Sequence, residues 1–203
     1  MTNRIGQTDK IHIESGLRPE HHAIAAAGYW NAFSRKLRYP LGPEAKALAF
    51  IASVMKPDHA ISATTMSGSF LGLASFKTSE GSFVGGGLRD LAKVYGWFGG
   101  TVRGLLAAIL DQEAKPDALL IDGIFVQPEA RSHGVGAALL DAIEQKAAGL
   151  GLKSVSLDVV DANPRAKALY ERHGFVESAR VSLGPLKPLF GFGTVTTMVK
   201  TIA

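Results

Sequence analysis

The stretch "LLIDGIFVQPEARSHGVGAALL", residues 119–140, passes from a strand-like apolar run through a glycine-bearing turn into a helical pattern. We predict a strand over 118–126 and a helix over 135–149, where apolar residues recur every three or four positions. Amides at a helix N-terminus point outward unpaired, and the helix dipole adds partial positive charge there. Glycines also remove the Cβ atoms that would hold a phosphate away. The stretch therefore predicts a phosphate-binding turn.

Two common nucleotide signatures do not fit this turn. A P-loop requires GxxxxGK[ST], and no glycine in the sequence is followed by lysine. A dinucleotide-binding turn requires GxGxxG, but after Gly134 and Gly136 the third glycine position holds Leu139. The pattern that fits is R-x-x-G-x-G, formed by Arg131, Gly134 and Gly136, in which the arginine adds a full positive charge.

The elements around the turn predict a mixed sheet. Residues 153–160 predict a strand, and 163–173 a helix with Asn163 as its N-cap and Pro164 at its first position. Strand, helix and strand over 118–160 form a crossover that requires two parallel strands. The other predicted elements are a strand at 10–15, helices at 19–38 and 42–56, a hairpin at 59–78, and strands at 175–183 and 194–202. We expect one α/β (α+β) domain over 1–203, with a centrally parallel sheet of about seven strands flanked by helices.

Residues 80–117 predict a helical insertion before the strand at 118–126. Apolar residues follow a helical stripe from 88 to 109, and the glycine pair at 99 and 100 should bend it. We expect one long broken helix or two short ones. Such a segment could form a wall of a substrate pocket, pack on a partner subunit, or cover the sheet.

Composition narrows the function classes. The chain has a net charge of +4 without a basic stripe, which argues against a nucleic-acid partner. It contains no cysteine and no HExxH spacing, so we expect no metal site and a cytoplasmic location. The apolar stretch 94–110 is short and is interrupted by Arg103, so we expect no membrane span.

Two motifs in order carry a family resemblance. The unit "IDGIFVQPEARSHGVGAALLDAIEQKAAGLGL" (121–152), followed by "SLDVVDANPRAKALYERHGF" (156–175), resembles the GNAT superfamily of acetyl-CoA-dependent N-acetyltransferases. In that superfamily an R/Q-x-x-G-x-G/A loop binds the coenzyme A pyrophosphate, and an N-x-x-A-x-x-x-Y-x-x-x-G-F helix follows. Asn163, Ala166, Tyr170, Gly174 and Phe175 match the second motif at every fixed position. The close resemblance covers roughly residues 118–176.

The resemblance implies acetyl-CoA as co-substrate and assigns residues to it. Strand positions Phe125 and Val126 correspond to those whose backbone pairs with the pantetheine arm, which requires neighbouring strands to separate. Asn163 corresponds to a residue that contacts the cofactor arm. The loop residues assigned to the pyrophosphate are Arg131, Ser132, His133, Gly134, Val135, Gly136 and Ala137. Many relatives carry glycine where Ser132 stands.

The resemblance also implies the catalytic groups. Tyr170 corresponds to the tyrosine that donates a proton to the leaving sulfur, although a packing role beside Leu169 is the alternative. Two acids could be the base: Asp122, where many relatives carry a glutamate, and Asp158, at a spacing that resembles peptide N-terminal acetyltransferases. Each could instead be a strand-edge acid bonded to the backbone. Both are shorter than glutamate, which favours proton transfer through water.

The implied activity is acetyl transfer to a primary amine of a small molecule or peptide, by direct attack in a ternary complex. The alternatives are a protein or peptide N-terminal acetyltransferase and a catalytically silent coenzyme A-binding regulatory domain. We expect the acceptor pocket to be built by the first two helices, by 80–117 and by 184–193. Aromatic residues in these segments suit an apolar acceptor, ordinary core, or the seam of a homodimer.

Overall fold

The computed structural model describes residues 10–110, 115–184, 187 and 191–202. They form an eight-stranded sheet in the order β1-β2-β3-β5-β6-β8-β7, with the short β4 paired to β3 outside this path. The strands are β1 (Ile11–Ser15), β2 (Ala60–Thr65), β3 (Phe70–Thr78), β4 (Gly81–Ser82), β5 (Ala118–Val126), β6 (Ser154–Val160), β7 (Val176–Ser182) and β8 (Thr194–Thr201). β5 and β6 are parallel, and the other strand pairs are antiparallel. The predicted mixed sheet is confirmed, but its parallel part is this one central pair.

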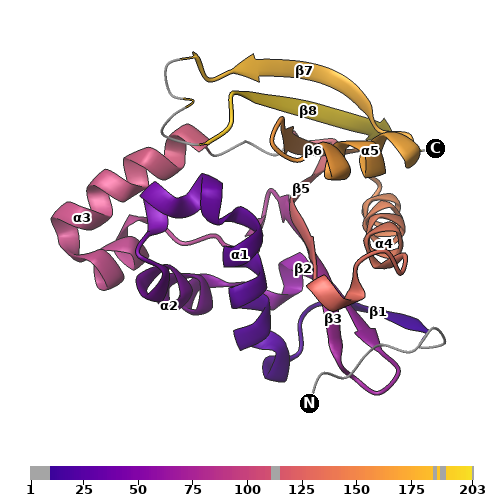
Figure 1. Ribbon diagram of the computed structural model, residues 1–203, viewed down its shortest axis with the longest axis horizontal. Coiled ribbons are helices and arrows are strands. Elements are labelled where there is room, and N and C mark those ends of the chain that lie inside the picture. Colours follow the sequence, from indigo (N-terminus) through magenta and orange to yellow (C-terminus); the bar gives the residue numbers. More distant parts are fainter. Residues whose placement is uncertain (1–9, 111–114, 185–186, 188–190, 203) are drawn as a thin grey trace.

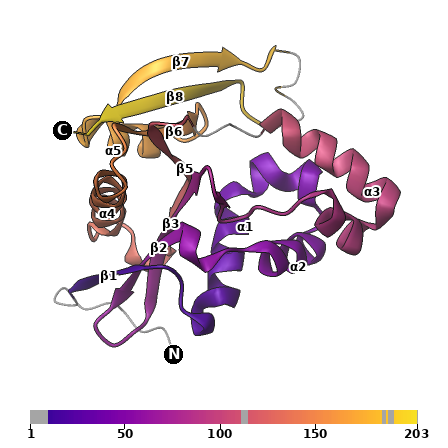
Figure 2. The same ribbon diagram turned by 180° about the vertical axis from the view of Figure 1, so that it is seen from behind.

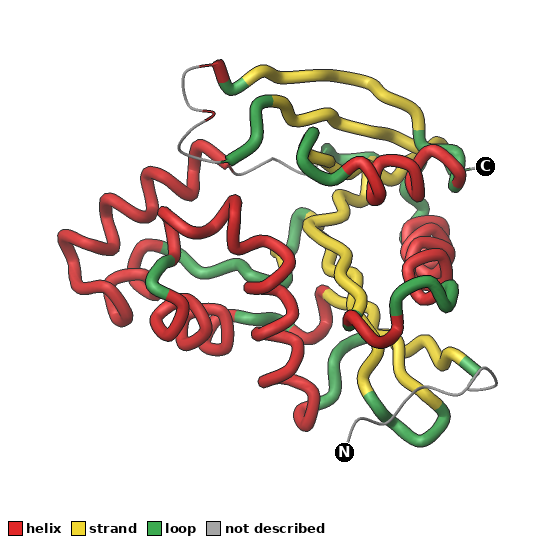
Figure 3. Tube along the Cα trace, in the orientation of Figure 1, coloured by secondary structure: helices red, strands yellow, loops and turns green. Residues whose placement is uncertain are grey.

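Helices cover both faces of the sheet (Figure 1). One face, called the α1 face, carries α1 (His22–Leu41), α2 (Glu44–Val54) and α3 (Leu88–Leu110). The other, called the α4 face, carries α4 (Val135–Gly149) and α5 (Pro164–Arg172), and the view from behind in Figure 2 shows the same division. β5 and α4 have the bounds that the sequence predicts. Figure 3 shows the loop joining them beside the end of the central strands.

Two apolar clusters fill the space between the sheet and its helices. The cluster on the α4 face includes Leu139 and Ile143 of α4, packed against Leu157 of β6. The cluster on the α1 face includes Phe50 of α2 and Phe125 of β5. Successive residues of a strand point to opposite faces of the sheet. A residue of β5 or β6 that lies in one of the two clusters therefore points to that face, and its neighbours in the strand point to the other.

The two central strands separate part of the way along their length. β5 pairs with β6 only from Ala118↔Ser154 to Ile121↔Leu157, although both strands continue beyond those residues. Beyond that point β5 follows β3, while β6 follows β8. The pairing of β5 with β3 passes from Ile121 to Gly123, which leaves Asp122 as the extra residue of a β-bulge. The bulge therefore lies where the separation begins.

Within 80–117, α3 runs from Leu88 to Leu110 and is broken at Gly96, whose φ of 74° is not helical. The predicted break is confirmed, but its predicted position at the glycine pair was wrong. Gly100 has another role: a Cβ there would lie 2.8 Å from the Ala92 nitrogen, so its lack of a side chain allows the two halves of α3 to pack closely. Among the described residues no helix is long and apolar enough to cross a membrane.

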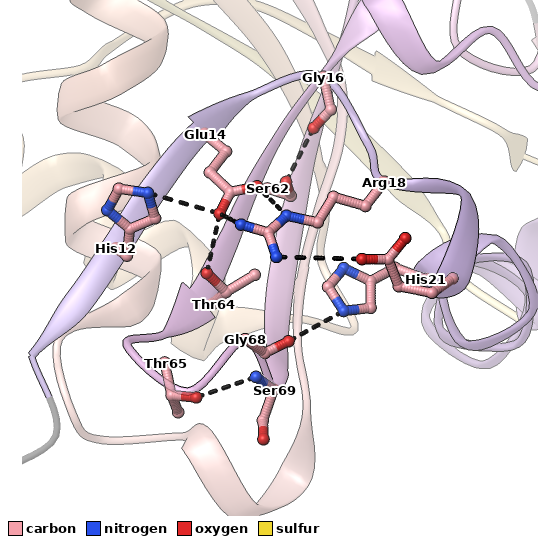
Figure 4. Close-up of polar contacts among 11 residues, drawn as sticks. His12, Glu14, Gly16, Arg18, His21, Ser62, Thr64, Thr65, Gly68 and Ser69 are labelled. Carbon is pink, nitrogen blue, oxygen red and sulfur yellow. Dashed lines mark hydrogen bonds and ion pairs between the residues drawn. The ribbon is translucent and has the colours of Figure 1, made fainter.

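A polar network fixes the start of α1 against the sheet (Figure 4). Arg18 donates hydrogen bonds to both carboxylate oxygens of Glu14, at 2.7 and 2.5 Å. These bonds hold the pKa of Glu14 below its usual value. His21 donates from Nε2 to the carbonyl oxygen of Gly68 in the β2–β3 turn, at 3.0 Å. The network links β1, the segment that leads into α1 and that turn.

Candidate active site

The glycine turn between β5 and α4 has the backbone of an anion-binding site. Ser132 and Gly134 both adopt positive φ, at 68° and 83°, and α4 begins at Val135. A Cβ added at Gly134 would meet no atom within 4 Å, so this glycine is required by its backbone angles. Gly136 serves packing instead, because a Cβ there would lie 3.2 Å from the Leu169 side chain of α5.

Unpaired donors converge on this turn. Amides 132–137 donate no hydrogen bond to the described part of the chain, and the first turn of α4 contributes the last three of them. Two arginines flank them. Arg131 donates from Nε to the Val126 carbonyl oxygen at 3.3 Å, and Arg165 of α5 donates to the Ser132 hydroxyl at 2.9 Å. Amides, helix dipole and guanidinium groups together suit a pyrophosphate.

Replacing Ser132 with glycine should give a more stable protein than replacing it with alanine. It is a non-glycine residue in the left-handed region, where a Cβ costs roughly 1–2 kcal/mol. Ser132→Ala and Ser132→Gly both lose the hydrogen bond with Arg165, but only glycine relieves the backbone. We expect the free energy of unfolding, measured with urea, to be about 1 kcal/mol higher for the glycine variant than for the alanine variant. Equal stabilities would show that this backbone conformation is not strained.

Tyr170 projects from α5 into the cluster on the α4 face. It is 8% exposed, and its ring centroid lies 6.0 Å from that of Phe175. Burial raises the pKa of its hydroxyl to about 12. The phenol is therefore protonated at neutral pH, and it makes no hydrogen bond to the described part of the chain. Such a hydroxyl is suited to donate a proton.

Asp122 lies on the α1 face at the bulge. The hydroxyl of Tyr29 in α1 donates to its Oδ2 at 3.3 Å. Tyr29 is buried, and burial, together with the negative charge of Asp122, raises the pKa of that hydroxyl well above its usual value. Tyr29 therefore remains a donor and orients the carboxylate. The bulge also turns Gly123 toward α1, where a Cβ would lie 2.3 Å from the Phe33 ring.

Asp158 also points to the α1 face, because its neighbours Leu157 and Val159 lie in the cluster on the α4 face. It has a different partner from Asp122. The hydroxyl of Thr197, opposite it on β8, donates to Asp158 Oδ1 at 2.8 Å. The two predicted acids therefore share a face but stand on opposite sides of the separation between β5 and β6.

A cavity of about 700 Å³ opens on the α1 face beside Asp122. It is lined by α1, α3, Phe50 of α2, the segment 82–87 and the sheet residues Lys77 and Asp122; Asp158 is not among its described lining residues. The first two helices and part of 80–117 thus border a cavity; that these segments form the acceptor pocket stays a prediction. Residues 184–193 are also expected to help build the acceptor pocket. Of these, residues 185–186 and 188–190 lie outside the described residues.

The other predicted cofactor residues take several positions. Phe125 packs into the cluster on the α1 face, and Val126 packs against the α4 face. Asn163 caps α5 by accepting a hydrogen bond from the Ala166 amide at 3.2 Å, as its place in the sequence predicts. His133 is exposed. The side chain of Val135 is buried and that of Ala137 is half-buried. What these two residues offer at the turn is therefore their main-chain amides.

Sequence reasoning missed two residues of the site, Tyr29 and Arg165. Tyr29 precedes Phe33 by one helical turn, and their ring centroids lie 4.8 Å apart, so helical spacing of aromatic residues was the available signal. Arg165 lies inside the second motif but at one of its free positions, and no sequence signal related it to Ser132.

Comparison with known proteins identifies a family. The family model described as "Acetyltransferase (GNAT) family" matches residues 46–175. An uncharacterized N-acetyltransferase of Bacillus subtilis, YhfO, is 36% identical over 29% of this chain and 39% of its own length. A mycothiol acetyltransferase of Propionibacterium freudenreichii is 44% identical over 31% of this chain and 20% of its own length. The match to these curated relatives thus spans well under half of each.

Solved structures resemble the fold over nearly the whole chain. An N-acetyltransferase from Staphylococcus aureus has a TM-score of 0.64 and 17% identity, with 93% of this chain and 100% of that chain covered. Ard1 from Thermoplasma volcanium has a TM-score of 0.59 and 16% identity, with 95% and 98% covered. At these identities the likeness concerns the fold.

Proposed function

Because the chain belongs to the GNAT family of acetyltransferases, we propose that it transfers an acetyl group from acetyl-CoA to a primary amine. The observation that carries this proposal is the turn at 131–136, where unpaired amides and two arginines stand beside the separation of β5 from β6. This arrangement fits a pyrophosphate with an arm leading into the sheet. Bound there, acetyl-CoA supplies the reactive thioester.

This geometry supports the following assignments of residues to the co-substrate. Arg131, Arg165 and the amides of 132–137 hold the pyrophosphate. Among the described residues, no strand pairs with the edge of β5 that faces away from β3 over 123–126, which leaves main-chain groups for the pantetheine arm. The proposal places the reaction at the separation of the strands, where groups from both faces of the sheet can act on it.

The chain contributes the proton transfers. A free alkylamine has a pKa near ~10 and must lose a proton before it attacks. The apolar cavity disfavours the ammonium form, and Asp122 accepts the proton, directly or through one water. Tyr170 donates a proton to the departing sulfur. We favour Asp122 over Asp158 as the base because Asp122 borders the cavity, whereas Asp158 is not among the described lining residues.

The absence of cysteine makes the activity test clean. Incubation with acetyl-CoA and a panel of amines, amino acids and peptides should release coenzyme A, which a thiol dye detects without background from the protein. Acetyl-CoA should also raise Tm, since a ligand at 100 times its Kd stabilises by about 2.7 kcal/mol. Arg131→Ala should weaken that shift. A shift without release from any amine would favour the silent domain, and no shift would contradict the binding site itself.

A further inference from the structure

The cavity beside Asp122 has a mixed lining in which apolar side chains predominate; the polar groups of its described lining, besides the ionisable ones, are the hydroxyls of Ser82 and Thr101 and the main chain of glycines 85–87. Among its described lining residues the ionisable side chains are Tyr29, Lys77 and Asp122, which lie on the sheet and on the adjoining part of α1. The segment 82–87 and residues of α3, including Leu88, Leu91 and Leu105, also line the cavity. Among the described lining residues, the ionisable side chains thus come from β3, β5 and α1 and none comes from α3.

The apolar part of the cavity is large enough to hold more than the amine itself. Its volume of about 700 Å³ is in the range of small-molecule sites, roughly 300–1,000 Å³. The Tyr29 and Phe33 rings line it from α1, and leucines line it from α3. Leu105, one of these leucines, is 70% exposed, so the cavity reaches solvent along α3.

We propose that the acceptor is a primary amine carried by an apolar aryl or alkyl body, with the amine at Asp122 and the body along α1 and α3. This inference rests on the proposed function, since it names the substrate class of the same site. The amine nitrogen forms the new bond to the acetyl carbon, whose bond to sulfur breaks. The amine proton passes to Asp122, and the sulfur receives its proton from Tyr170.

The apolar majority of the lining disfavours polar acceptors. A polyamine or an amino sugar would bring further charges or hydroxyl groups against Phe33, Leu37 and Leu91, which offer no hydrogen-bond partners. Burying such groups unpaired is costly. An apolar body instead gains from each methylene removed from water. The site therefore selects among primary amines by the polarity of the group that carries the amine.

A chain-length series tests this inference. We expect kcat/KM to rise about fourfold per methylene from butylamine to octylamine. Phenethylamine should be a substrate, whereas kcat/KM for spermidine and for glucosamine should be lower than for octylamine by about 100-fold or more. A flat series, or polar amines used as well as octylamine, would overturn the inference.

Two glycines of α3 provide a matched pair of variants. A Cβ at Gly104 would contact the Leu88 and Leu91 side chains at 3.5 Å without a clash, and Gly104 lines the cavity. Gly104→Leu should therefore fill the cavity, lowering kcat/KM for octylamine at least tenfold while butylamine changes little. Gly99 lies on the same helix outside the described lining, where a Cβ also has room. Gly99→Leu should leave the length preference unchanged, and equal effects of the two variants would count against this pocket.

The outcomes separate the inference from the proposed function. If polar amines release coenzyme A and apolar amines do not, the chain is an acetyltransferase and only the substrate class is wrong. If no amine of either kind releases it, the proposed function fails, and the inference fails with it. The acetyl-CoA thermal shift, measured in both Gly variants, verifies that each protein is folded and binds the co-substrate.

Discussion

Tyr170→Phe should lower kcat about 100-fold, within the range that removal of a general acid costs. Because the pKa of the Tyr170 hydroxyl is raised to about 12, that group stays protonated across neutral and mildly alkaline pH. The deficit should therefore be the same at every pH from about 6 to about 9, well below that pKa. Rates of wild type and variant, measured side by side over this range, should give parallel profiles.

The substitution leaves the packing intact, so the kinetic effect can be isolated. Phenylalanine keeps the ring contact with Phe175, and no described residue loses a hydrogen bond to the hydroxyl. The acetyl-CoA thermal shift should be unchanged. Tyr39→Phe is the matched control, because Tyr39 is 41% exposed and is not among the described cavity-lining residues. A kcat within threefold of wild type in Tyr170→Phe would leave Tyr170 as a packing residue only.

The local elements could be predicted because local signals determine them. β5 and α4 keep the bounds read from the sequence, since an apolar run and a helical stripe meet at a turn whose glycine has left-handed angles. Asn163 and Pro164 likewise set the start of α5. In each case the signal and the structure involve residues within a few positions of one another.

Features that depend on a distant partner escaped prediction. The bulge at Asp122 arises from the way β5 pairs with β3. No sequence pattern within β5 predicts that pairing. The break in α3 falls at Gly96 because the halves on either side must pack together, with Gly100 at the crossing. The contact between Tyr29 and Asp122 joins residues 93 positions apart. The cavity is built from such contacts, so the acceptor could not be inferred from sequence.

Asp122→Asn should lower kcat/KM about 100-fold near pH 7, and the deficit should shrink as pH rises. Asparagine keeps the shape of the side chain and can still accept the hydrogen bond from Tyr29, but it cannot take a proton. The variant then depends on amine that is already neutral, a fraction that grows about tenfold per pH unit toward the amine pKa near ~10. Its profile should therefore approach that of wild type at about pH 9.5, unlike the constant deficit of Tyr170→Phe.

The same substitution at Asp158 decides between the two acids. Asp158→Asn retains an acceptor for the Thr197 hydroxyl, so its fold should be kept. If Asp122 is the base, the pH-dependent deficit appears in Asp122→Asn and not in Asp158→Asn. The reverse result would move the base across the strand separation to β6, away from the described cavity lining. A deficit in both, with the double variant no worse than either, would mean that the two carboxylates act on one proton path through water.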